Sequence, residues 1–97
     1  MRMFFVEVRL NMALAYINMM LLENAKESLY VALKCVIDHF GCNSVVLARC
    51  LGLDAVLRQR EGDFSKAEKL YVKAISIFEK HCHEVIITKL LLICMHY

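Results

Sequence analysis

Apolar residues recur along this chain at steps of three and four, which is the period of an α-helix. One run occupies residues 22–38 and consists of Leu22, Ala25, Leu29, Ala32, Leu33 and Val36. A second run occupies residues 64–80 and consists of Phe64, Ala67, Leu70, Tyr71, Ala74, Ile75 and Phe78. The pattern predicts that both sets face inward from helices, and it indicates an all-α fold.

Turn-forming residues separate the predicted helices. Gly41 breaks the pattern, and Asn43 or Ser44 can cap the helix that follows. Gly62 can adopt a positive φ angle, and Asp63 can cap the next helix. The sequence thus predicts helices over about 3–18, 22–38, 45–60 and 64–80, with a fifth that begins near Glu84 or Val85. The short connections predict antiparallel neighbours.

The chain resembles itself when it is shifted by 42 residues. The shift superposes identical residues, which are Ala13 on Ala55, Ala25 on Ala67, Ala32 on Ala74 and His39 on His81. Because alanine lets another helix approach closely, a shared spacing of alanines indicates a shared packing geometry. The same shift aligns residues 19–21 with the turn at Gly62, which places a helix boundary there although the segment has no glycine or capping residue.

Two segments resemble the tetratricopeptide repeat family. Gly62-Asp63-Phe64, followed by Ala67, Tyr71 and Ala74, resembles the second half of such a repeat, and Asn11 to Tyr16, with Ala13, resembles its first-helix signature. The period of 42 is similar to that of the kinesin light chain and nephrocystin subclass. The resemblance implies a right-handed superhelix of antiparallel helix-turn-helix repeats in one domain, 1–97. The implied repeats cover about 3–38 and 43–80, and a partial third covers about 84–97.

The chain departs from the family pattern in ways that affect packing. The subclass has proline in its inter-repeat loop, and this sequence has no proline. Asp54 and Arg58 stand where the family has Leu and Tyr, and their i, i+4 spacing allows them to pair on a helix surface. We expect this stripe to be less buried than usual. Both ends, residues 3–6 and 90–95, are apolar, which indicates a piece of a longer array and predicts self-association.

Composition excludes several classes of protein. Sixty percent of the 97 residues are apolar and the net charge is only +2, which gives no indication of nucleic acid binding. The longest apolar run near the C-terminus, residues 90–95, is far shorter than the ~20 residues of a membrane span. With no signal peptide and an odd number of cysteines, five, the sequence predicts a cytoplasmic protein with reduced thiols.

Candidate reactive groups are few, and none forms a convincing site. Zinc could use His81, Cys82, His83, Cys94 and His96, but their spacing matches no known finger. Cys42 lies near His39 without a third orienting residue, so a cysteine nucleophile is a remote alternative. Lys66, Lys69 and Lys73 form a basic stripe that suits a solvated face. We predict no enzyme activity, no cofactor and no metal site.

The resemblance implies that the first helices of the repeats line a concave groove that binds protein or peptide. Its ligand-facing positions correspond to Glu7, Leu10, Asn11, Leu14, Asn18, Arg49, Gly52, Val56, Gln59 and Arg60. We expect Asn11 and Asn18 to bond a peptide backbone, and Arg49 and Arg60 to attract acidic groups. The predicted ligand is therefore an apolar segment followed by acidic residues. The alternative is a structural segment that contacts only neighbouring repeats or an identical chain.

Overall fold

The computed structural model describes the backbone of residues 2–41 and 44–96, and the side chains of residues 4–41 and 44–87. Within these ranges the chain is all-helical, as the sequence predicts. The helices are α1 (Arg2–Asn18), α2 (Leu22–Phe40), α3 (Val45–Arg60) and α4 (Phe64–His96). The helices α2, α3 and α4 start at their predicted first residues and α1 starts one residue earlier, so the turn residues define the element starts well.

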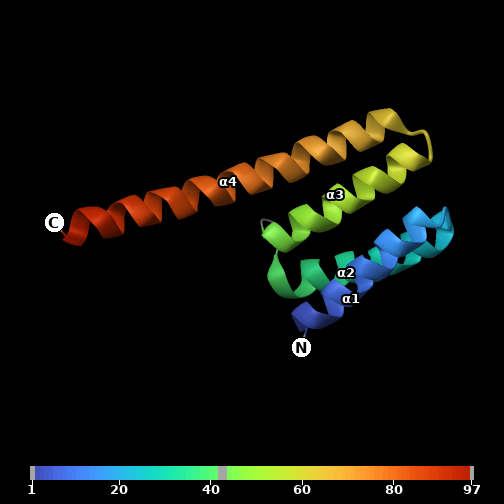
Figure 1. Ribbon diagram of the computed structural model, residues 1–97, viewed down its shortest axis with the longest axis horizontal. Helices are drawn as coiled ribbons and strands as arrows, with labels where there is room; N and C mark the ends of the chain where they lie inside the picture. The colour runs from blue at the N-terminus through green and yellow to red at the C-terminus, as the bar shows by residue number, and fades with distance from the viewer. Residues whose placement is uncertain (1, 42–43, 97) are drawn as a thin grey trace.

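Consecutive helices run antiparallel and form two hairpins, α1 with α2 and α3 with α4 (Figure 1). The hairpins join through α3, which packs against both α2 and α1. Among the described residues, α4 packs against α3 alone, and its C-terminal part extends beyond the other helices (Figure 1). The two hairpins therefore differ in how many of their surfaces are covered.

The alanines aligned by the shift of 42 all lie in the interior of the protein. They are Ala13, Ala25, Ala32, Ala55, Ala67 and Ala74, and each is buried. Larger apolar side chains, among them Val6, Ile17 and Leu57, fill the space between these contacts. The alanines that the shift of 42 superposes are therefore interior positions in both hairpins.

The two turns that close α1 and α3 have the same geometry. The amide of Gly62 donates to the Gln59 carbonyl (3.0 Å), and the amide of Asp63 donates to the Arg58 carbonyl (2.9 Å). Forty-two residues earlier, Met20 donates to Ile17 (3.0 Å) and Leu21 to Tyr16 (2.8 Å). Both are Schellman motifs, which need a left-handed residue after the helix. Gly62 supplies it at φ 89° and Met20 at φ 61°, which confirms the boundary at residues 19–21.

Side-chain caps start α3 and α4 as predicted. Ser44 Oγ accepts from the amide of Leu47 (3.2 Å), and Asp63 Oδ1 accepts from the amide of Lys66 (3.2 Å). Each bond satisfies an amide in the first turn that has no partner within the helix. The start of α2 has no such bond, because Leu21 has no side-chain acceptor.

The predicted break before Glu84 is wrong, because α4 continues from Phe64 to His96 without interruption. Residues 79–86 contain no glycine, no proline and no residue that would favour a cap over the helix interior. The predicted partial third repeat at about 84–97 therefore does not begin with a separate helix, because residues 84–96 belong to α4. The side chains of its apolar run, residues 90–95, lie outside the described residues.

Three of the α4 residues predicted to face inward are exposed instead. Phe64 is 65% exposed, Ile75 53% and Phe78 38%. They lie on a side of α4 where no other described helix packs, whereas Ala67, Ala74 and Ile77 face α3 and are buried. The periodic pattern identified the apolar positions of α4 correctly. It wrongly assigned all of them to the buried face, whereas some lie on the face that packs on α3 and others on an exposed face.

Candidate functional site

A depression of about 270 Å³ lies where α1 runs beside α3. Its lining residues come from both helices and are Leu10, Asn11, Leu14, Arg49, Gly52, Leu53 and Val56. Six of these belong to the ligand-facing set expected from the sequence, and the seventh, Leu53, stands 42 positions after Asn11. We call this feature the α1–α3 depression.

The floor and walls of the α1–α3 depression are mainly apolar. Leu10 is buried beneath it, Leu53 and Val56 are half-buried, and Leu14 remains 45% exposed. Asn11 is exposed beside Leu14 and presents the amide group nearest to this apolar surface. The arrangement offers apolar contact with a flanking group that can both donate and accept hydrogen bonds.

Gly52 keeps the α1–α3 depression open. It lies inside α3, where glycine is about 1 kcal/mol less favourable than alanine. No atom lies within 4 Å of the position that a Cβ would occupy, so neighbouring groups do not require a glycine here. A side chain at this position would instead project into the depression, since Gly52 is one of its lining residues.

Arg49 forms an ion pair within the protein. Its guanidinium donates to both carboxylate oxygens of Glu7 on α1, with Nη2 3.0 Å from Oε2. The hydrogen bond from Arg49 lowers the pKa of Glu7, and the same bond raises the pKa of Arg49. Glu7 and Arg49 occupy equivalent positions of the two hairpins, 42 residues apart. The expectation that Arg49 attracts acidic groups is thus modified, because Glu7 already balances its charge.

Asn18, Gln59 and Arg60, which the sequence also places in the groove, do not line the α1–α3 depression. Gln59 Oε1 accepts a hydrogen bond from Tyr71 Oη of α4 (3.1 Å), so Gln59 joins the two helices of its own hairpin. Arg60 is exposed, and its Nη1 lies 4.0 Å from the sulfur of Met20 in the turn between α1 and α2. Asn18 is exposed at the end of α1.

A second polar cluster joins α2 to the end of α3. Arg58 Nε contacts Asp54 Oδ1 (3.2 Å), which confirms the predicted i, i+4 pair. Arg58 also contacts Glu61 (3.4 Å), and Lys26 of α2 contacts Glu61 (2.6 Å) and Glu23 (3.3 Å). The hydrogen bond to Glu61 is the main cause that raises the pKa of Lys26. Sequence reasoning missed the link from Lys26 to Glu61, because only the packing of α2 on α3 brings the two together.

The cysteines do not form a reactive centre among the described residues. Burial raises the pKa of the Cys50 thiol to about 11, which keeps it protonated at neutral pH. Cys82 is exposed on α4 between His81 and His83, and no group of three potential metal ligands converges within the described part of the chain. Cys42 and the side chains of Cys94 and His96 lie outside the described residues. The predicted basic stripe of Lys66, Lys69 and Lys73 is exposed.

No helix among the described residues is both long enough and apolar enough to cross a membrane. Comparison with protein-family models, with curated proteins and with solved structures found no match. The geometry of the α1–α3 depression is therefore the basis on which a function can be argued.

Proposed function

We propose that this chain is a non-catalytic, tetratricopeptide-like interaction segment that binds a peptide or helix of a partner protein in the α1–α3 depression. The pattern of helix contacts supports the repeat interpretation. Each hairpin packs internally, the second helix of the first hairpin contacts the first helix of the second, and the two first helices contact each other. Stacked repeats bury a continuous core in this way and present their first helices as a binding surface.

The observation that carries the binding proposal is Gly52. A glycine in a helix interior weakens the helix, and no neighbouring atom of this chain requires it. Because Gly52 lines the α1–α3 depression, it has a role if a ligand approaches the backbone of α3 closely. Glycine often marks such close approaches.

The lining residues suggest the chemistry of the ligand. Leu14, Leu53 and Val56 offer an anchor site for an apolar side chain, and Asn11 can bond the ligand backbone. Because Glu7 neutralises Arg49, the attraction for acidic residues rests mainly on Arg60, which lies outside the depression. The three described free cysteines suit a reducing compartment, so we place this binding in the cytoplasm.

Selection from a displayed library of random peptides tests the proposal. The expected result is an enriched set of peptides that share an apolar anchor residue. Their affinity should fall at least about tenfold with Leu14→Asp, because a carboxylate would enter the apolar wall and an anchor contact carries more than 1.4 kcal/mol.

Ile37→Asp is the matched control, since Ile37 is an equally exposed apolar residue on α2, at 48%, outside the depression. It should leave the affinity unchanged, and both variants should keep the helical circular dichroism of the parent. Failure to enrich any peptide, or equal binding to both variants, would argue against a ligand site between α1 and α3.

A further inference from the structure

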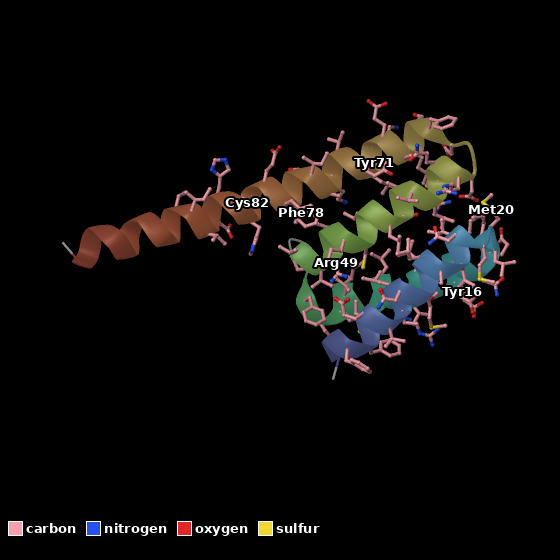
Figure 2. The ribbon with its side chains drawn as sticks, viewed as in Figure 1. Tyr16, Met20, Arg49, Tyr71, Phe78 and Cys82 are labelled. Atoms are coloured by element: carbon pink, nitrogen blue, oxygen red, sulfur yellow. The ribbon has the colours of Figure 1, made fainter. Side chains whose placement is uncertain are left out.

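One side of α4 carries an uncovered row of apolar residues, which we call the α4 stripe. It consists of Ile75, Phe78, Cys82 and Ile86, which recur at steps of three and four. A depression of about 280 Å³ is lined by these four residues, together with Glu79 and His83. Figure 2 shows Cys82 on the stretch of α4 that runs past the start of α3. Contiguous apolar surface of this kind is a common mark of an interaction site.

The equivalent face of α2 shows what such a stripe binds. The residues of α2 that stand 42 positions before Ile75, Phe78 and Cys82 are Leu33, Val36 and Phe40. Val36 is buried in the core, and Leu33 and Phe40 pack against the core cluster. This is the side on which α2 meets α3, because Leu33 lines a depression together with Leu57 and Arg58 of α3. The α4 stripe therefore repeats the surface by which α2 holds a first helix.

The first helix of the chain, α1, has an exposed face that matches this surface. On α3, the residues Leu47, Cys50 and Leu57 are buried. Their equivalents on α1 are Phe5, Val8 and Ala15, and all three are exposed. We call this row the α1 stripe.

Two substitutions make the α1 stripe more apolar than its counterpart. Met12 and Met19 stand where α3 has Asp54 and Glu61. The charged cluster that links α2 to α3 is thus replaced on α1 by flexible apolar side chains, which adapt to irregular surfaces.

We propose that the α4 stripe binds the α1 stripe of a second copy of this chain, so that α1 of one copy packs on α4 of the next as α3 packs on α2. The two stripes are different surfaces, and the contact is therefore heterologous, or head-to-tail. The assembly keeps a free α1 stripe at one end and a free α4 stripe at the other. Association continues beyond a dimer as the concentration rises.

Charge complementarity favours a second copy over an unrelated apolar partner. Within one chain, Glu7 of α1 pairs with Arg49 of the adjacent α3. In the head-to-tail assembly the next first helix is α1 of the second copy, which places its Glu7 beside Arg49 of the first. The side chain of Arg49 is still 44% exposed and can donate a hydrogen bond to a second carboxylate. Glu7 and Arg49 of the first copy, followed by Glu7 and Arg49 of the second, would then form one row of side chains in which negative and positive charges alternate.

Sedimentation equilibrium of the full chain over a range of concentrations tests this proposal. The wild type should show a weight-average mass that rises above that of a dimer. Ile75→Glu disables the α4 stripe and Phe5→Glu disables the α1 stripe, and each should lose concentration-dependent association. Both variants should fold, because both sites are exposed. In the wild type the guanidinium carbon of Arg9 lies 5.4 Å from the centre of the Phe5 ring, so the new glutamate in Phe5→Glu lies near a positive charge.

Mixing the two variants distinguishes a head-to-tail contact from other modes of association. Each variant keeps the stripe that the other has lost, so an equimolar mixture should give a dimer that grows no further. Ile37→Glu, an exposed apolar site outside both stripes, should behave as the wild type. A wild type that stays monomeric at every concentration would overturn the proposal. So would an Ile75→Glu or a Phe5→Glu variant that associates as strongly as the wild type, or a mixture that remains monomeric while the wild type associates.

Discussion

The two hairpins of this protein have the same helix order and the same alanine contacts, but they differ in how their turns and outer surfaces are built. The first hairpin closes with Met20 in a left-handed conformation, and the second closes with Gly62. The face of α2 that covers α3 is buried, whereas the equivalent face of α4 is exposed. A shared backbone geometry thus tolerates different side chains at the turn, while the exposure of each face depends on whether a neighbouring helix is present.

The hairpins also differ in how their helices are joined. Ser28 is buried in α2, and its Oγ donates to the carbonyl of Arg9 in α1 (2.8 Å). The equivalent residues of the second hairpin are Leu70 and Leu51, which are apolar. The first pair of helices is thus joined by the hydrogen bond of a buried serine, whereas the second pair has apolar residues at these positions and is joined by the exposed hydrogen bond from Tyr71 to Gln59. This difference predicts that the hairpins respond differently to the same substitution.

The largest effect is expected at the alanine contacts. Ala25→Leu and Ala67→Leu should each overpack a buried helix contact and cost about 1–3 kcal/mol of unfolding free energy. Ala25→Leu should cost more, because α2 is held between α1 and α3, whereas α4 packs on α3 alone and can shift. Chemical denaturation measures both values. An equal or reversed order would contradict the difference in covered surface between the two hairpins.

The turn residues should respond in opposite directions. Met20→Gly relieves a left-handed residue that carries a side chain, a conformation that costs roughly 1–2 kcal/mol for L-residues, so it should raise the melting temperature. Gly62→Ala imposes the same conformation on a residue with a Cβ and should lower it. Thermal unfolding followed by circular dichroism compares the pair. A loss of stability in Met20→Gly would show that the two turns are not equivalent.

A smaller effect is expected from pH, through the pair of Glu7 and Arg49. Because Arg49 lowers the pKa of Glu7 in the folded chain, the ionised carboxylate stabilises the fold above the ordinary pKa, 4.5, and this contribution is lost as pH falls through the lowered pKa. Glu7→Gln should therefore lose less stability below about pH 4.5 than the wild type does. Glu27→Gln, at an exposed glutamate of α2, should follow the wild type. Matching acid profiles for all three proteins would argue against the pair.

The smallest change concerns thiol chemistry and leaves the fold intact. Iodoacetamide should modify Cys82, which is exposed, and should leave Cys50 unmodified near neutral pH, because Cys50 is buried and its pKa is raised to about 11. If the α4 stripe packs against a second copy, the modification of Cys82 should slow as the protein concentration rises. In Phe5→Glu the rate should stay constant. Peptide mass mapping identifies the modified thiol.

The sequence predicted the helices and the alanine contacts because both depend on local spacing. The continuity of α4 was not predicted. The repeat pattern led us to expect a boundary between residues 80 and 84, although residues 79–86 contain no helix breaker. Sequence reasoning also missed the bond from Ser28 to Arg9 and the link from Lys26 to Glu61. These contacts join residues of different helices, and their geometry depends on how the helices pack.

The candidate site was predicted in part for the same reason. The family resemblance implied that Leu10, Asn11, Leu14, Gly52 and Val56 face one groove, and all five line the α1–α3 depression. The role of Arg49 depended on Glu7, which lies 42 residues away and pairs with it only because α1 and α3 lie side by side. Gln59 was expected in the groove, but its side chain bonds Tyr71 of α4.

Peptide affinity of two Gly52 variants tests the central claim, that the α1–α3 depression is a ligand site, most directly. Gly52→Ala should stabilise the chain by up to about 1 kcal/mol, because alanine favours the helix interior and its Cβ meets no neighbour. Gly52→Leu should fold equally well but fill the depression, and titration calorimetry should show that it no longer binds the selected peptides. Binding by Gly52→Leu with wild-type affinity would contradict the claim.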